Sequence, residues 1–451
     1  MAENVELPSP AWRDQAIATP ADNPAKARRI ALTAGLAASI EWYDFFIYGT
    51  AAALVFGPMF FPSANPVAGI LVAFATFGVG FVVRPIGGIL FGHFGDKFGR
   101  KPMLVVAMIM MPAATTLIGL LPTYSSIGIA APVLLVLFRI CQGLAVGGQW
   151  GGAMLMATEN APEGKRGLYG SFVQVGVPVG LVAGNAVFLV IARVVSPEQF
   201  MSWGWRVPFL LSAVFLLLAL HIHFRIEDTP EFRQAEAKLA TLSQRRRRSP
   251  VIDVLRRHPR QVLTATGALL GGNAALYVLV TGTLDYATRT LGIPKDKMLI
   301  AVFATMSTAI VLIPLFAYLS DRIGRRRVCA AGSIVMGVWP FAVFPLVETT
   351  NLVWIVLALE VAIIAISAGY GPLAALFAEL FPAHLRYSGV SFAYQFASVF
   401  GGGVAPFIMV LLLESTGSSV AVSAYLSVLS VIALVSLALM RFTPVERSAP
   451  R

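Results

Sequence analysis

The chain has little of what enzymes commonly use for chemistry. It contains 2 cysteines and 5 histidines among 451 residues. Cys141 and Cys329 lie in or beside apolar runs, and the histidines show no spacing typical of metal ligands, so we expect no disulfide, no metal site and no redox motif. No G-x-x-x-x-G-K-[ST] sequence occurs, which argues against work driven by ATP. We therefore predict that the protein is not an enzyme and has no catalytic residue and no cofactor.

Charge is also scarce, and this excludes an ordinary soluble fold. Charged residues make up 13% of the chain and hydrophobic residues 57%, with a mean hydropathy of +0.76, whereas a soluble domain carries about 25% charged residues. A helix that spans a bilayer needs about 20 mostly apolar residues. Twelve such runs lie at residues 30–56, 67–91, 103–121, 132–157, 168–192, 207–224, 262–288, 298–319, 328–347, 352–377, 388–413 and 420–440. The sequence predicts an all-α membrane protein with twelve transmembrane helices.

The net charge of +11 is explained by topology and does not require a nucleic-acid partner. With twelve spans, 27 of the 34 Lys and Arg residues lie on the side of the termini, 5 on the other side, and 2, Arg84 and Arg139, within spans. Because cytoplasmic loops carry the excess of Lys and Arg, we expect a multi-pass protein of the cell (inner or plasma) membrane with both termini cytoplasmic. The run Arg245–Arg248 is either a solvated linker or a site for anionic lipid head groups.

Two near-copies of one charged turn lie 225 positions apart in the sequence. They read Gly92-His93-Phe94-Gly95-Asp96-Lys97-Phe98-Gly99-Arg100-Lys101 and Ala317-Tyr318-Leu319-Ser320-Asp321-Arg322-Ile323-Gly324-Arg325-Arg326. Such a repeat predicts two homologous six-helix bundles, as in many secondary transporters. The expected division is a tail (1–29), a first bundle (30–224), a linker (225–261), a second bundle (262–440) and a second tail (441–451).

Charged residues inside the spans are few and costly to bury, so they are the first functional candidates. They are Glu41, Asp44, Arg84, Arg139, Asp285 and Glu360. Glu41 and Asp44 are three residues apart and share a helix face that Tyr48 continues. Two close carboxylates in a low dielectric resist double ionisation, which suits a proton acceptor. We predict proton coupling at Asp44 and Glu41, with Asp44 the better candidate. The alternative is that both are permanently neutralised by the two arginines.

The two buried arginines have two interpretations. A guanidinium stays charged and binds carboxylates through two hydrogen bonds, so Arg84 and Arg139 either bind an anionic substrate or form ion pairs with Asp44 or Glu41. The other polar residues in the spans also have two interpretations: they line a central cavity, or they join helices by hydrogen bonds. Those that we place at the substrate site, with the two arginines, are Tyr48, Gln142, Gln174, Tyr277 and Gln395.

The two charged turns are expected at the cytoplasmic surface, away from the substrate. Gly99 allows close backbone approach, and Asp96 can accept hydrogen bonds from a neighbouring helix N-terminus and pair with Arg100. Making and breaking such contacts would gate the inward side, with Asp321 and Arg325 acting likewise in the second copy. The alternative is a turn that serves topology alone.

These motifs resemble the major facilitator superfamily, and more closely its metabolite:proton symporters, which include transporters of shikimate, α-ketoglutarate, citrate and proline/betaine. The resemblance covers about residues 30–440. It rests on the charged turns and on Glu41-Trp42-Tyr43-Asp44-Phe45, Arg84-Pro85-Ile86-Gly87-Gly88 and Arg139-x-x-Gln142-Gly143. It implies alternating access and proton-driven uptake, with Asp44 and Arg139 near the proton and substrate site and Asp96 and Arg100 in the gate.

We therefore expect a functional monomer in the lipid bilayer that imports a small organic metabolite with protons. A carboxylate such as shikimate or a dicarboxylate is favoured, because two buried arginines suit an anion. Two alternatives remain open. One is a compatible-solute (proline/betaine) symporter. The other is a proton-coupled antiporter that exports an amphipathic compound, because Gly176-Val177-Pro178-Val179-Gly180 is similar to a motif of proton-linked drug exporters.

Overall fold

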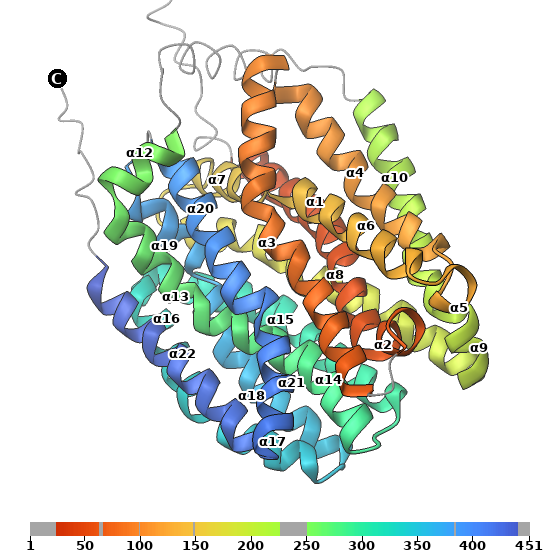
Figure 1. Ribbon diagram of the computed structural model, residues 1–451. Coiled ribbons are helices and arrows are strands. Elements are labelled where there is room, and N and C mark those ends of the chain that lie inside the picture. Colours follow the sequence, from red (N-terminus) through yellow and green to blue (C-terminus); the bar gives the residue numbers. More distant parts are fainter. Residues whose placement is uncertain are drawn as a thin grey trace, which may run out of the picture.

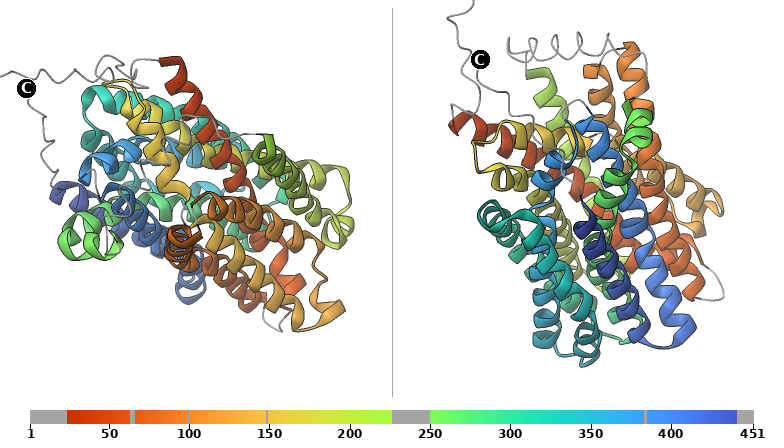
Figure 2. Two further views of the ribbon diagram at one scale, coloured as in Figure 1. Left: turned by 90° about the horizontal axis from the view of Figure 1, so that it is seen from above. Right: turned by 90° about the vertical axis from the view of Figure 1, so that its left-hand side faces the viewer.

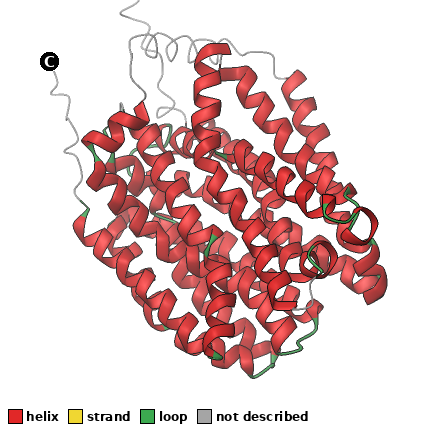
Figure 3. Cartoon of the chain, in the orientation of Figure 1, coloured by secondary structure: helices red, strands yellow, loops and turns green. Residues whose placement is uncertain are grey.

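The computed structural model describes residues 24–62, 66–98, 100–147, 149–225, 250–382 and 385–440. These residues form helices joined by short turns, with no strand among them (Figure 3). The first half consists of α1 (Pro24–Ala51), η2 (Ala52–Phe56), α2 (Gly57–Phe60), α3 (Pro66–Phe98), α4 (Arg100–Leu120), α5 (Tyr124–Ile127), α6 (Ala130–Val146), α7 (Gln149–Glu159), α8 (Arg166–Val194), α9 (Pro197–Ser202), η3 (Gly204–Arg206) and α10 (Val207–Arg225).

The second half follows a short helix, α12 (Pro250–Arg257). It consists of α13 (Pro259–Tyr277), η4 (Val278–Gly282), α14 (Thr283–Asp285), η5 (Tyr286–Thr290), α15 (Lys295–Ile323), α16 (Arg325–Val338), α17 (Pro340–Glu348), α18 (Leu352–Tyr370), α19 (Leu373–Leu380), α20 (Arg386–Ser398), η6 (Val399–Gly403), α21 (Ala405–Thr416) and α22 (Ser419–Leu439). The helices of the first half, coloured red to yellow-green, lie beside those of the second half, coloured green to blue (Figures 1 and 2).

The helices correspond to the predicted spans. Of the described residues, eight helical stretches are long and apolar enough to cross a membrane, and a ninth is α16 with α17, bent by 48°. The bend falls at Pro340, which cannot donate a helical hydrogen bond. Three shorter apolar helices lie at Val106–Leu120, Ala130–Val146 and Gly204–Leu217, where the remaining runs were expected. Helices suit a bilayer because their backbone N–H and C=O groups form hydrogen bonds with one another within the helix.

The same helix pairs recur in the two halves. In the first half α1 packs on α8, α3 on α6 and α4 on α10; in the second half α13 packs on α20, α15 on α18 and α16 on α22. The halves meet along α8 with α15, and along α3 with α20 and η6. We call the end of the bundle at which α15 ends the Asp321 end, and the end at which α15 begins the Lys295 end. The predicted pair of repeated six-helix bundles is confirmed.

Glycines bring α3 and α6 into close contact. A Cβ atom added to Gly147 would overlap the carbonyl oxygen of Arg84, one added to Gly87 that of Leu144, and one added to Gly143 that of Gly80. Small residues at such crossings let backbones approach closely in membranes. The crossing therefore fixes the two helices that carry Arg84 and Arg139.

Replacing Gly147 with alanine should destabilise this crossing. We expect the free energy of unfolding to fall by about 1–3 kcal/mol, because the added methyl group has no space and the backbones must separate. Thermal unfolding of the purified protein in detergent measures the effect. Gly272→Ala is the matched control, since a Cβ at Gly272 meets no atom within 4 Å. Equal stability of the two variants would contradict the close crossing.

Candidate functional site

The centre of the first half holds two buried guanidinium groups. Arg84 on α3 and Arg139 on α6 are both 0% exposed. Each guanidinium carbon lies 4.1 Å from the ring centroid of Phe45 on α1. The Phe45 ring therefore contacts both charges, which suits the attraction between a cation and an aromatic face.

Further aromatic rings complete this surface. Arg84 lies 4.5 Å from the ring centroid of Phe81 and 5.4 Å from that of Trp42. Arg139 lies 4.3 Å from the ring centroid of Tyr48 and 4.9 Å from that of Phe77. The aromatic residues come from α1 and α3, so the two arginines lie on a rigid and mostly apolar layer.

The two arginines differ in their hydrogen bonds. Arg139 donates from Nη1 to Oε1 of Gln142 (2.9 Å) and from Nη2 to the carbonyl oxygen of Phe77 (3.4 Å). Gln142 in turn donates from Nε2 to Oγ1 of Thr115 (2.8 Å), which orients its amide. For Arg84, none of the three guanidinium nitrogens has a hydrogen-bond partner among the described residues, and Nε of Arg139 also lacks one.

Neither predicted ion pair is formed. In the part of the chain that the structure describes, no carboxylate lies within 4.0 Å of a guanidinium nitrogen of Arg84 or Arg139. Asp44 instead accepts a hydrogen bond at Oδ1 from the hydroxyl of Ser212 on α10, and its Oδ2 has no partner. In this conformation Asp44 is therefore directed toward α10 and away from an arginine partner.

Glu41 lies near charged and polar groups of both halves. It is only partly buried, and it interacts electrostatically with Arg84 and with Tyr394 on α20 of the second half. Asp44 is 0% exposed, and among the described residues the charged side chain that interacts with it is Glu41. The two acids thus face different surroundings: Glu41 faces the arginines and the second half, whereas Asp44 lies inside the first half.

Arg84 and Arg139, together with the aromatic rings that they contact, are called the arginine layer below. Tyrosines of the second half lie against this layer. The ring of Tyr277 stacks on Phe46 (centroids 5.6 Å apart) and meets Phe81 edge-on (5.2 Å). Tyr277, Tyr370 and Tyr394 are all close enough to interact electrostatically with Arg84. Residues from both halves therefore surround the unpaired guanidinium.

Two of the predicted substrate residues join the halves through backbone groups. Gln395 donates from Nε2 to the carbonyl oxygen of Gly147 (3.2 Å), and Gln174 donates to the carbonyl oxygen of Tyr370. Oε1 of each glutamine lacks a partner among the residues described. Tyr48 donates to Oγ1 of Thr76 (2.9 Å) while its ring faces Arg139. Tyr48, Gln142, Gln174, Tyr277 and Gln395 are thus gathered at the arginines or at the adjoining interface.

The structure describes the side chains of the second copy of the predicted gate, at Asp321 and Arg325. Asp321 accepts hydrogen bonds from the backbone N–H groups of Gly167 (2.9 Å) and Leu168 (3.0 Å), which open α8 of the other half. Arg325 donates to Asp321 (3.2 Å) and pairs with Glu379. A carboxylate is stabilised at a helix N-terminus, so Asp321 holds the halves together at this end.

The first copy of the turn is only partly visible. Asp96 and Arg100 lie at the facing ends of α3 and α4, but their side chains are not among those described, and Gly99 lies outside the described residues. A further contact between halves at this end joins Arg386 to Glu159 (3.0 Å). The gating role of Asp96, Gly99 and Arg100 stays a prediction.

Replacing Asp321 with alanine should open the Asp321 end. Its bonds to backbone N–H groups involve a charge, and each contributes about 1.5–3 kcal/mol, so we expect the ratio of closed to open molecules to fall about tenfold or more. Spin labels at the exposed positions Glu163 and Arg327, in a chain without Cys141 and Cys329, would report longer distances.

The control for this experiment is Arg322→Ala. Arg322 lies in the same turn but contacts Tyr318 of its own half, so its removal should leave the distances unchanged. Identical distance distributions for Asp321→Ala and the parent protein would contradict the gate.

The Lys295 end is closed as well, by residues that the sequence did not single out. Lys295 donates to the carbonyl oxygen of Leu54 in η2 (3.4 Å), and Asp296 pairs with Arg193 on α8 (3.3 Å). Contacts between the two halves are thus present at both ends of the bundle.

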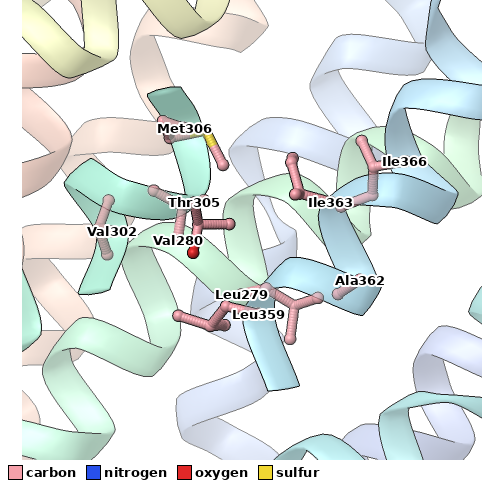
Figure 4. A pocket seen from close by; sticks show the side chains of 9 residues that line it. All are labelled: Leu279, Val280, Val302, Thr305, Met306, Leu359, Ala362, Ile363 and Ile366. Carbon is pink, nitrogen blue, oxygen red and sulfur yellow. The ribbon is translucent and has the colours of Figure 1, made fainter. Parts of the chain in front are cut away.

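Two small cavities stand out among the described residues, and neither includes an arginine. One is apolar and lies between η4, α15 and α18, with the hydroxyl of Thr305 in its wall (Figure 4).

Comparison with known proteins identifies the family. The model of the Major Facilitator Superfamily matches residues 65–406 and 273–451. The shikimate transporter of Escherichia coli (strain K12) is 44% identical over 389 residues, covering 86% of this chain and 88% of the relative. The inner membrane metabolite transport protein YhjE of the same strain is 39% identical over 441 residues, covering 95% and 99%. The proline/betaine transporter of Salmonella typhimurium (strain LT2) is 33% identical over 415 residues, covering 91% and 83%.

Solved structures share the fold. A crystal structure of a D-xylose-proton symporter superposes with a TM-score of 0.71 at 18% identity, covering 92% of this chain and 97% of the other. The inward-open xylose transporter XylE from E. coli gives a TM-score of 0.67, covering 93% and 96%. With twelve apolar runs in two repeated bundles and relatives that match most of its length, the chain is a multi-pass membrane transporter that belongs to the major facilitator superfamily.

Proposed function

We propose that the protein is a proton-coupled symporter that takes up a small organic carboxylate by alternating access. The observation that carries the proposal is the pair of buried guanidiniums that form no ion pair with a carboxylate of the described residues. Burying a charge without a counter-ion is costly, so the arginine layer is incomplete until an anion joins it. A substrate carboxylate provides the missing charge and the missing hydrogen-bond acceptors.

Arg84 would be the principal ligand of that carboxylate. None of its guanidinium nitrogens has a hydrogen-bond partner among the described residues, and its planar fork matches the two oxygens of a carboxylate. Arg139 is held by Gln142 and Phe77, so it would contribute mainly a fixed charge. Tyr277, Tyr370 and Tyr394 lie on the other side of the interface and would contact the rest of the substrate, which links binding to the approach of the second half.

The proton would be carried by the acids of α1. An ionised Glu41 competes with the substrate for Arg84, because both are anions that lie close to one guanidinium. Protonation of Glu41 removes this competition and leaves Arg84 free for the substrate. Asp44, which has one hydrogen bond and no cation beside it, would hold a proton in the interior of the first half. Proton binding and anion binding would then favour each other.

The sidedness follows from charge. Lys and Arg residues concentrate on the side of the termini, so the Asp321 end is assigned to the cytoplasm and the Lys295 end to the outside. The two bundles, divided at residues 225–261, would rock about the arginine layer while the contacts of Asp321 and Lys295 break in turn. One chain holds both halves of the site, so a monomer would suffice.

The names of the relatives support this substrate class. One is a shikimate transporter and another a proline/betaine transporter, and all of these compounds carry a carboxylate. Proline or betaine is the second candidate, because aromatic rings, which surround the arginines, also attract quaternary ammonium groups. An acid without an ammonium group is preferred, since the guanidiniums already lie on the rings of Phe45 and Phe81.

Uptake by proteoliposomes with an inward proton gradient tests the proposal. Shikimate, α-ketoglutarate and citrate would be compared with their methyl esters, and with proline and glycine betaine. We expect one acid to accumulate and its ester not to. Accumulation of only proline or betaine would favour the second candidate, and proton-driven efflux of an amphipathic compound with no uptake would overturn the proposal.

A further inference from the structure

A second buried carboxylate lies in the second half, away from the arginine layer. Asp285 in α14 is 1% exposed. Its Oδ2 lies 3.4 Å from Nε of Arg289, one helical turn further along. Its Oδ1 has no hydrogen-bond partner among the described residues and is buried. One oxygen of this acid is thus free to hold a proton.

Arg289 is shared between this acid and a second one that reaches the surface. Its Nη1 lies 3.2 Å from Oε1 of Glu414 on α21. Asp285 is 2% exposed at the side chain, Arg289 25% and Glu414 42%. The three side chains therefore form a line from the interior to the surface at the Lys295 end, with one positive and two negative charges.

The remaining charged groups around α14 are directed elsewhere. The π-helical segments η2 and η4, which pack against α14, contain no titratable residue. Tyr286 donates to Glu348 (3.0 Å). At the start of α15, Lys295 binds a carbonyl oxygen in η2 and Asp296 pairs with Arg193. Among the described residues, Arg289 and Glu414 are the charged partners of Asp285.

We propose that Asp285 is a second proton-binding site of the transporter, loaded from the Lys295 end. A proton from water at that end binds to Oδ1 of Asp285, Arg289 keeps its own proton, and the net charge of the three side chains rises from −1 to 0. Arg289 then pairs with Glu414 alone. The inference rests on the proposed function for its role in transport, but the site itself does not depend on it.

The position of Asp285 links this site to the substrate. It follows Tyr277 by eight residues on one continuous helical stretch, which is about 12 Å along the axis. Between the two lies η4, and such π-helical turns within helices occur often at functional sites. Because α14 also packs against η2 of the first half, a change at Asp285 reaches the interface that opens at the Lys295 end.

Infrared difference spectra of the purified protein, recorded as pH is stepped, test the site without requiring transport. We expect a carbonyl band of a buried carboxyl group that disappears in Asp285→Asn and persists in Glu41→Gln and Asp44→Asn. A spectrum of Asp285→Asn that superposes on that of the parent protein would overturn the proposal. If the band behaves as expected but proteoliposomes show no proton-coupled uptake, the proposed function fails while the site stands.

Two further variants give an independent result should Asp285→Asn fold poorly. Arg289→Gln removes the cation, so at fixed pH the ratio of protonated to ionised Asp285 should rise about tenfold or more. Glu414→Gln removes a competing anion and leaves Arg289 to Asp285, so the same ratio should fall. No change of the band in either variant would contradict the shared arginine.

Discussion

Arg84→Gln should bind the substrate carboxylate about 30-fold or more weakly than the parent protein. Removing one member of a buried, hydrogen-bonded charge pair costs about 2–5 kcal/mol, and each 1.4 kcal/mol corresponds to a factor of ten in affinity. Arg84→Lys should lose part of this affinity, since an ammonium keeps the charge but not the planar fork. Calorimetric titration of the purified variants measures both effects.

The stability of the empty protein separates a binding role from a structural one. Arg84 has no hydrogen-bond partner among the described residues, so its removal eliminates a buried unpaired charge and should not lower the melting temperature. Arg327→Gln, at an exposed position, is the matched control and should bind normally. Unchanged affinity in Arg84→Gln, or a large loss of stability without substrate, would contradict the assignment.

Glu41→Gln and Asp44→Asn should lose accumulation driven by a proton gradient and keep exchange of substrate across the membrane. The neutral side chains mimic the protonated state, so the substrate still binds Arg84, but the side chain can no longer bind a proton on one side and release it on the other, and uptake is uncoupled from the proton gradient. We expect uphill uptake to fall to the level of empty liposomes. Counterflow and gradient-driven uptake in the same liposomes separate the two activities.

Glu360→Gln serves as the control for these variants. Glu360 is also an acid within a span, but it bonds to Thr308 (3.1 Å) within the second half, between α15 and α18. Its replacement should leave gradient-driven uptake intact. If both Glu41→Gln and Asp44→Asn still accumulate substrate, the proton is carried elsewhere.

The features that depend on composition and spacing could be predicted from the sequence. Apolar runs defined the spans, and the repeated turn defined two bundles, because both signals are local. Arg84 and Arg139 stood out because charge within a span is costly. Neither composition nor spacing predicted that both arginines contact Phe45, although Phe45 belongs to the motif that begins at Glu41. The reason is that packing sets the rotation of α1 against α3 and α6.

Contacts between distant segments could not be predicted. Ser212, the partner of Asp44, is 168 residues away and is a common residue in membrane helices. The sequence left an arginine partner for Asp44 open as an alternative, whereas the structure directs Asp44 to Ser212 on α10 and leaves Glu41 as the acid that interacts with Arg84. Lys295 and Asp296, which close one end, looked like ordinary loop charges, and only their contacts with Leu54 and Arg193 reveal what they do.

The most direct test of carboxylate–proton symport is proton movement in proteoliposomes loaded with a pH-sensitive dye. The accumulated acid would be added outside with no imposed gradient, and Asp44→Asn and Arg84→Gln liposomes would run in parallel. The arrangement of Glu41, Asp44 and Arg84 predicts that the acid acidifies the interior in the parent protein and in neither variant. Uptake without acidification, or an alkaline shift that indicates exchange for protons, would contradict it.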